Sequence, residues 1–162
     1  MLRLGLVLLA AVLVLAACGG GGGGKRLTKA ELISRGDAIC TKYREKNVQL
    51  QKQAPAKSPT DPSASDEDIR RSGPILDKLA DNVRGARSEF ARLEPPKDTE
   101  SDWKNTLDDL DQIASKLDDA AAAAKNVDRQ KIVNVYAEAL RLNSRVSNFE
   151  QGYGFRVCGK SS

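Results

Sequence analysis

The chain has 162 residues, of which 40% are hydrophobic and 30% are charged, and it carries a formal net charge of +4. This balance is typical of a globular domain, and the roughly 135 residues after Leu27 are enough for one hydrophobic core. Aromatic residues make up only 4% of the chain and charges of both signs are mixed, so we expect no nucleic-acid interface. The lack of His removes the commonest general base and the commonest neutral metal ligand.

Residues 1–17 have the pattern of a bacterial secretion signal. Arg3 precedes an apolar run over 4–15, which is too short for a transmembrane helix of about 20 residues. Leu15-Ala16-Ala17-Cys18 resembles the lipobox of bacterial lipoproteins, and this resemblance implies that Cys18 is lipidated and begins the mature protein. In the alternative interpretation, an ordinary signal peptidase cleaves nearby and Cys18 has no special role.

The six glycines at 19–24 predict a flexible tether with an r.m.s. span of about 13 Å. Two or three acyl chains on Cys18 would anchor the protein stably, because each buried CH₂ contributes about 0.8 kcal/mol. We therefore predict a signal peptide over 1–17, a lipidated cysteine and Gly-rich tether over 18–27, and a helical domain over 28–162. The expected location is the extracytoplasmic face of the cell membrane, held there by the lipid anchor.

Hydrophobic periodicity predicts four amphipathic helices over about 28–54, 66–93, 100–125 and 129–152. Thr28 and Glu31 have the spacing of a capping box for the first helix, and Asp128 is the expected N-cap of the fourth. Three prolines within 55–65 predict a mobile loop. The expected core-facing positions are Leu32, Ile39, Cys40, Tyr43, Asn47 and Leu50; Ile69, Leu76, Leu79, Val83, Ala86, Phe90 and Leu93; Trp103, Leu107, Leu110, Ala114, Leu117, Ala121 and Ala124; and Ile132, Val135, Ala139, Leu142, Val146, Phe149 and Tyr153.

The two central helices carry further signals. Pro74 lies inside the second helix, but the heptad phase continues past it, so one kinked helix is favoured over two separate ones. Thr99 is expected to cap the third helix, with the Asp102 side chain three residues later completing a capping box. The core residues of this helix shrink from Trp103 to Ala124, which implies close helix approach at the alanine end.

Four amphipathic helices joined by short links predict an all-α fold, an antiparallel up-down four-helix bundle in which the fourth helix ends beside the start of the first. With Cys18 lipidated, Cys40 and Cys158 are the remaining thiols on an oxidising side of the membrane, and we expect them to form a disulfide. The bond would close a loop of about 118 residues and contribute nearly 5 kcal/mol. A metal site, a reactive thiol and a bond to another chain are the alternatives.

Both ends and the midpoint of the chain resemble one known family. The stretches are Leu-Thr-Lys-Ala-Glu-Leu-Ile at 27–33, Asp-Ala-Ile-Cys at 37–40, Leu-Glu-Pro-Pro at 93–96 and Tyr-Gly-Phe-Arg-Val-Cys-Gly at 153–159. They are similar to a family of small actinobacterial lipoproteins of uncharacterised activity, in which the cysteine pair falls at the positions of Cys40 and Cys158. The resemblance implies a secreted helical domain closed by a disulfide, and it implies nothing about a substrate.

The sequence contains no catalytic constellation and no cofactor or metal motif, so an enzyme is the least favoured class. Three groups of residues are candidates for binding sites, and each also has a simpler interpretation. The third helix carries the acids Asp108, Asp109, Asp111, Asp118 and Asp119, which could bind calcium. One rigid helix cannot wrap six or more oxygens around an ion, however, so a solvated helix face is favoured.

The aromatic residues near helix ends could line a ligand pocket, but such residues more often seal a core. They are Trp103, Tyr153 and Phe155. A basic face on the fourth helix could bind anionic polymers or lipid, although scattered surface charge is the default interpretation. Its residues are Arg129, Lys131, Arg141 and Arg145.

Two functions remain open at this point. The favoured hypothesis is a membrane-tethered, non-catalytic binding or assembly module that acts through a helix face on a protein or an anionic polymer of the cell envelope. The alternative is a carrier of a small apolar or lipid ligand, since helix bundles build ligand sites between their helices. The shape of the bundle interior separates the two hypotheses, because only a carrier needs a roomy one.

Overall fold

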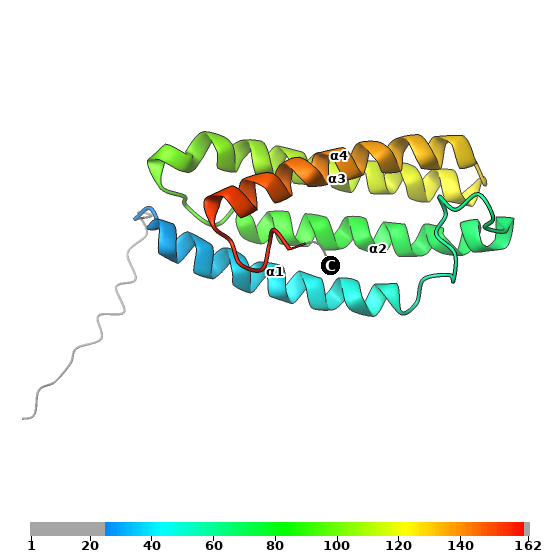
Figure 1. The fold of residues 1–162 in the computed structure, drawn as a ribbon, viewed down its shortest axis with the longest axis horizontal. Helices are drawn as coiled ribbons and strands as arrows, with labels where there is room; N and C mark the ends of the chain where they lie inside the picture. Colours follow the sequence, from blue (N-terminus) through cyan, green and yellow to red (C-terminus); the bar gives the residue numbers. More distant parts are fainter. Residues whose placement is uncertain (1–24, 161–162) are drawn as a thin grey trace, which may run out of the picture.

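The computed structural model describes residues 25–160, and its helices lie side by side along the longest axis of the molecule (Figure 1). The helices are α1 (Lys29–Gln51), α2 (Asp66–Phe90), α3 (Glu100–Lys125) and α4 (Arg129–Tyr153). A short 3₁₀ helix, η1 (Lys97–Thr99), leads into α3. Over the described range the chain contains no strand, and the predicted all-α class is confirmed.

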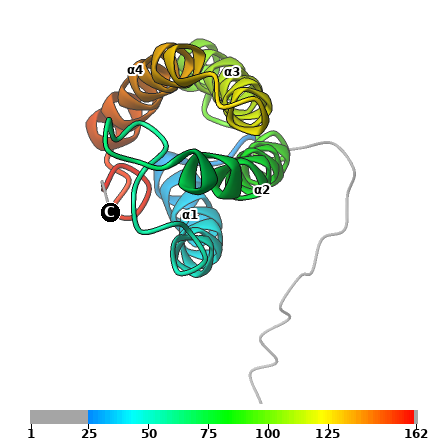
Figure 2. The same ribbon diagram turned by 90° about the vertical axis from the view of Figure 1, so that its right-hand side faces the viewer.

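Helices that are neighbours in the sequence pack on one another. Backbones approach closely along α2 and α3, along α3 and α4, and less extensively along α1 and α2. In contrast, no Cα atom of α1 lies within 8 Å of a Cα atom of α4. The end view in Figure 2 shows α1 set apart from α4, with the C-terminal segment 154–160 between them. The bundle is therefore joined on this side by the C-terminal segment and not by helix packing.

The caps explain where the helices begin. Thr28 and Glu31 form the predicted capping box, and Ser65 and Asp68 form a second one at the start of α2. Asp128 caps α4 by accepting a hydrogen bond of 3.0 Å from the backbone N–H of Lys131, as predicted. Thr99, however, makes no cap with its side chain, so that prediction is wrong. The one-turn η1 leads directly into α3, and the Thr99 hydroxyl bonds to the Asp98 carboxylate instead.

Two helices end earlier than their periodicity predicts. α1 stops at Gln51 and α2 at Phe90, each three residues before the expected end. In both places the chain continues in a tight turn, because a proline follows a few residues later and disfavours helix before it. α2 runs through Pro74 as one helix, as expected.

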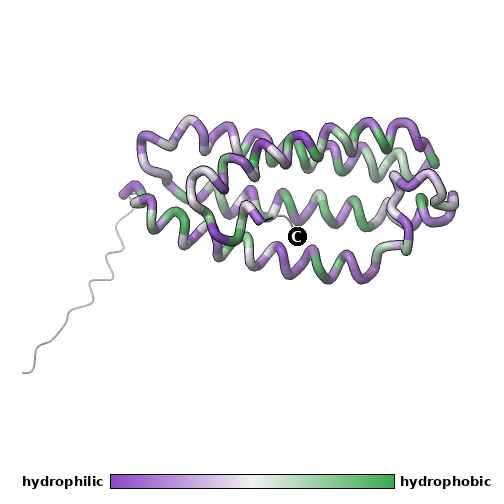
Figure 3. Tube along the Cα trace, in the orientation of Figure 1, coloured by the Kyte–Doolittle hydropathy of each residue, from purple (hydrophilic) through white to green (hydrophobic). Residues whose placement is uncertain are grey.

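The core is built from amphipathic faces, seen in Figure 3 as green hydrophobic stretches alternating with purple hydrophilic ones along each helix. The predicted close approach at the alanine end of α3 is present. A Cβ atom on Gly73 of α2 would lie 3.4 Å from the carbonyl oxygen of Ala121 and 3.7 Å from the Cβ of Ala124. The central cluster of the core consists of Leu76, Ala80, Ile113, Leu117, Ala120, Ala121, Val135, Leu142 and Val146.

The central cluster contains no residue of α1, and the amino-acid composition of α1 accounts for this absence. The second half of α1, from Glu45 to Gln51, is mostly polar, and it has too little apolar surface to bury against α4. Asn47 and Leu50 were expected to face the core, but both are only partly buried. The apolar residues of α1 instead join an aromatic cluster at the opposite end of the helix: Leu32, Ile39, Tyr43, Phe90, Trp103 and Phe155.

The loop 55–65 was predicted to be mobile, and in the structure its last residues are attached to the bundle. Ala64 is only 4% exposed and packs with Ile69 and Ile132. The Arg129 guanidinium donates to the carbonyl oxygen of Ala64 at 2.8 Å and to the carboxylate of Asp66 at 2.9 Å. The loop thereby closes one end of the space between α1 and α4.

Candidate ligand-binding groove

A groove occupies the space that the separation of α1 and α4 leaves open. It consists of two hollows with volumes of about 240 Å³ and about 280 Å³, and Gln51 lines both of them. The first hollow lies between 40–51 of α1, 143–150 of α4 and 157–160. The second lies between the end of α1, residues 54–59 of the loop and 72–79 of α2. The two hollows together are called the α1–α4 groove below.

The floor of the α1–α4 groove is apolar. Leu79, Val83, Leu110 and Tyr136 pack against the central cluster, yet each stays partly exposed. All four side chains line the groove. A first helix with a complete apolar stripe would cover these residues. Because it does not, they offer apolar surface whose burial by a ligand is favourable by about 25 cal/mol per Å².

The α1 wall of the groove is held in place by its bonds to α2. The carboxylate of Glu89 accepts hydrogen bonds from the Lys42 ammonium at 2.5 Å and the Tyr43 hydroxyl at 2.8 Å. These two bonds hold the pKa of Glu89 below its ordinary value. Further along, the side-chain amide of Asn82 donates to that of Asn47 at 2.9 Å. The wall is thus fixed to α2 while its other side faces the groove.

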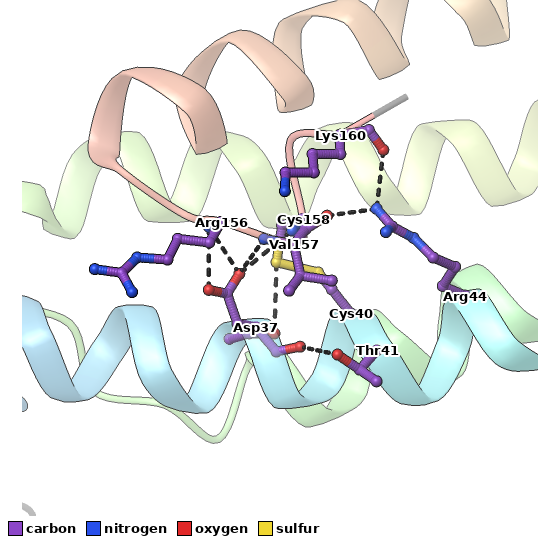
Figure 4. The surroundings of a disulfide bond; sticks show 9 residues. Asp37, Cys40, Thr41, Arg44, Arg156, Val157, Cys158 and Lys160 are labelled. Carbon is purple, nitrogen blue, oxygen red and sulfur yellow. Dashed lines mark hydrogen bonds between the residues drawn. A yellow bond between two sulfur atoms is a disulfide. The ribbon is translucent and has the colours of Figure 1, made fainter. Parts of the chain in front are cut away.

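The end wall is the C-terminal segment 154–160, which is attached to α1 (Figure 4). The disulfide and the hydrogen bonds that make this attachment are together called the clasp below. The disulfide joins Cys40 to Cys158 with their Cα atoms 5.2 Å apart, so the predicted pairing is confirmed. The Asp37 carboxylate, one turn before Cys40, accepts hydrogen bonds from the backbone N–H groups of Arg156, Val157 and Cys158. Three convergent amides on one carboxylate make a strong, charge-assisted attachment.

Two further contacts complete this clasp. The Arg44 guanidinium donates to the carbonyl oxygens of Val157 at 2.6 Å and Lys160 at 3.0 Å. The ring of Phe155 lies over Gly36, so close that a Cβ atom there would fall 2.3 Å from its Cε1. Glycine is less favourable than alanine in a helix interior by about 1 kcal/mol. At position 36 the missing side chain makes room for Phe155.

Glu150 lies at the end of the groove beside the disulfide, with only 9% of its surface exposed. Its carboxylate and the sulfur atoms of Cys40 and Cys158 lie within 4.8 Å of one another. Burial, and secondarily the negative charge of Asp37, raises the pKa of Glu150 to about 7. In the described part of the chain, the Glu150 side chain has no hydrogen-bond or ion-pair partner.

Sequence reasoning missed Glu150, although a signal was present. The residue follows Val146 by four positions, and it therefore lies on the buried face of α4. The three groups Cys40, Cys158 and Glu150 have the donor types of a metal site. Both sulfur atoms are bonded to each other, however, and a disulfide sulfur is a poor ligand because metals bind the thiolate.

The aromatic residues gather in a core below this end of the groove. The Trp103 ring stacks on Phe155 with centroids 6.4 Å apart and meets Phe90 edge to face at 5.6 Å. Tyr153 stacks on Phe149 at 5.6 Å. The favoured interpretation of Trp103, Tyr153 and Phe155 as residues that seal a bundle core is thereby confirmed. The indole Nε1–H of Trp103 is buried without an acceptor in the described residues.

The other charged sets from the sequence are spread over the surface. Acids of α3 pair with arginines of neighbouring helices: Asp118 with Arg84, Asp111 with Arg87, and Asp109 with Arg145. Arg129 of the basic set pairs with Asp66. These acids are engaged one by one and do not converge on a common point, which agrees with a solvated helix face. Cys18, the predicted lipidation site, lies outside the described residues.

Comparison of the chain with models of protein families, with curated proteins and with solved structures gave no match. Among the described residues, no helix has an apolar stretch long enough to cross a membrane. The geometry of the groove is therefore the basis for an inference about function.

Proposed function

We propose that this protein is a non-catalytic, lipid-anchored binding protein of the cell envelope that holds a small amphiphilic ligand in the α1–α4 groove. The observation that carries the proposal is the apolar floor left uncovered between α1 and α4. Of the two functions left open by the sequence, this open groove favours the carrier over the assembly module.

The dimensions of the groove support a small ligand. Its two hollows, of about 240 Å³ and 280 Å³, are each close to the lower end of the range of roughly 300–1,000 Å³ that is common for ligand sites. Its lining combines apolar side chains on the floor with polar and charged groups around them, as ligand sites do. In the first hollow these groups are Arg44, Asn47, Gln51, Asn82, Asn143, Ser147, Glu150 and Lys160.

The proposal includes the parts of the molecule that precede the helices. Residues 1–17 would be removed as a signal peptide, Cys18 would carry the lipid, and the glycines at 19–24 would hold the domain near the membrane surface. We further propose that the four helices form an antiparallel up-down bundle. The packing of sequence neighbours on one another supports this topology.

Native mass spectrometry of the full lipoprotein, released gently from membranes, tests the proposed function. We expect a copurified amphiphile in addition to the covalent anchor. Ser147→Trp places a large side chain in the groove and should abolish that adduct, whereas Ser144→Trp, on the exposed side of α4 one turn earlier, should leave it unchanged. The absence of any adduct, or equal adducts in both variants, would contradict the proposal.

A further inference from the structure

The end of the α1–α4 groove presents a buried carboxyl group whose charge has no counterpart. Glu150 is 9% exposed, lines the groove, and is met by no cation in the described residues. Burying a carboxylate without a partner is costly, so such a group either binds a proton or takes a cationic partner, and at the end of a groove a ligand can supply that cation.

The charged groups around Glu150 do not supply that partner. Asp37 on α1 is itself an acid, and its oxygens are occupied by the three amides of the C-terminal segment. Arg44 on α1 is the arginine that lines the hollow, but it is directed to the carbonyl oxygens of Val157 and Lys160. Lys160 also lines the hollow, but this residue is exposed and makes no ion pair with Glu150. The local field at Glu150 therefore favours a positive ligand group.

Aromatic surface surrounds the same point. Phe90 lines the groove with Glu150, and Phe90, Trp103 and Phe155 share a small internal hollow with it. The faces of aromatic rings attract organic cations by about 0.5–2 kcal/mol. A carboxylate beside aromatic side chains is a suitable environment for an ammonium group.

From Glu150 the groove floor leads away over apolar side chains. Val83 and Leu110 lie in the first hollow, and Leu79 and Tyr136 lie in the second. A ligand that reaches Glu150 with its head therefore lays its remaining length on apolar surface. This arrangement fits a single-chain amphiphile with its polar group at one end.

From this arrangement we infer that the ligand is a single-chain amphiphile with a protonated amine head, held with its ammonium group against Glu150. The inference rests on the proposed function, because it requires the groove to be a ligand site. A carboxylate or phosphate head would be repelled by Glu150 and Asp37. A neutral head would enter the groove but would leave the charge of Glu150 uncompensated.

The test compares three probes of equal length on the full lipoprotein in phosphatidylcholine vesicles at pH 8. The probes are octylamine, octanol and octanoate, and the readout is the fluorescence of Trp103, the single tryptophan of the chain. We expect octylamine to bind about tenfold more tightly than octanol, the scale of a charge-assisted hydrogen bond, and octanoate to bind most weakly. In Glu150→Gln, the affinity for octylamine should fall to that for octanol, which should not change.

Glu138→Gln serves as the matched control, because Glu138 is an exposed acid of α4 that pairs with Lys116 outside the groove. It should leave all three affinities unchanged. Equal binding of the three probes, or tighter binding of octanoate, would overturn the inference while the groove remained a ligand site. Failure of all three probes to bind would overturn both the inference and the proposed function. The comparison of probes on the unchanged protein decides the matter even if Glu150→Gln folds poorly.

Discussion

The substitution Gly36→Ala should destabilise the protein, although helix propensity alone predicts the opposite. Alanine is favoured over glycine in a helix interior by about 1 kcal/mol. At Gly36, however, the new Cβ atom would lie 2.3 Å from Cε1 and 3.1 Å from Cδ1 of Phe155. Carbon atoms in contact are ordinarily about 3.5–4.0 Å apart, so either the ring or the helix has to move.

The Phe155 ring has little freedom to move. It is 7% exposed, stacks on Trp103 at 6.4 Å and lies 5.5 Å from the ring of Tyr153. The backbone next to it is held by Asp37 and by the disulfide. Overpacking of this kind costs about 1–3 kcal/mol, from which the propensity gain of about 1 kcal/mol is subtracted. We expect the free energy of unfolding to fall by up to about 2 kcal/mol.

Gly152→Ala is the matched control, since a Cβ atom at Gly152 in the last turn of α4 would meet nothing within 4 Å. It should raise the free energy of unfolding by up to about 1 kcal/mol. Urea unfolding of both variants with the disulfide intact measures the two changes as shifts in midpoint at constant m. If Gly36→Ala proved as stabilising as Gly152→Ala, the packing of Phe155 on α1 would be refuted.

The remaining predictions concern the clasp and the buried acid. Replacing both Cys40 and Cys158 by Ser should lower the free energy of unfolding by about 2–5 kcal/mol while the helical circular dichroism persists; an unchanged melting midpoint would show that the bond is not stabilising. Asp37→Asn should cost about 1–3 kcal/mol and speed amide hydrogen exchange at 156–158, and unaltered exchange there would count against the clasp. Glu150 has a pKa raised from an ordinary value of 4.5 to about 7, so the folded state binds the extra proton and stability should fall as pH rises through this window, by at most about 3 kcal/mol. Glu150→Gln should remove that part of the slope, and a wild-type stability profile identical to that of the variant would contradict it.

The sequence carried strong local signals, and these predicted the corresponding local structure. Thr28 with Glu31, and Asp128, mark helix starts by cap chemistry that depends on residues only three positions apart. The taper from Trp103 to Ala124 predicted where α3 approaches its neighbours, because small side chains permit close backbones. The prediction that Thr99 caps α3 was wrong because the chain enters α3 through η1. The three residues after Thr99 do not reveal this 3₁₀ turn.

The candidate groove could not be predicted in the same way, because it results from a contact that the chain does not make. The polar second half of α1 was visible in the sequence, but its consequence depends on whether another segment fills the space beside α4. Gly36 and Phe155 are separated by more than a hundred residues in the sequence. Only the tertiary structure shows that the Phe155 ring packs into the space that the missing side chain of Gly36 leaves.

By itself, the sequence determined the all-α class and most of the helix faces, since periodicity and caps are properties of composition and spacing, and it favoured the pairing of Cys40 with Cys158 over the alternatives. Only the tertiary structure decided that α1 stands away from α4, that Asp37 holds the C-terminal segment, and that Glu150 is buried without a partner. The physical reason is that burial and charge compensation depend on all the groups that surround a side chain, and those groups come from distant parts of the chain.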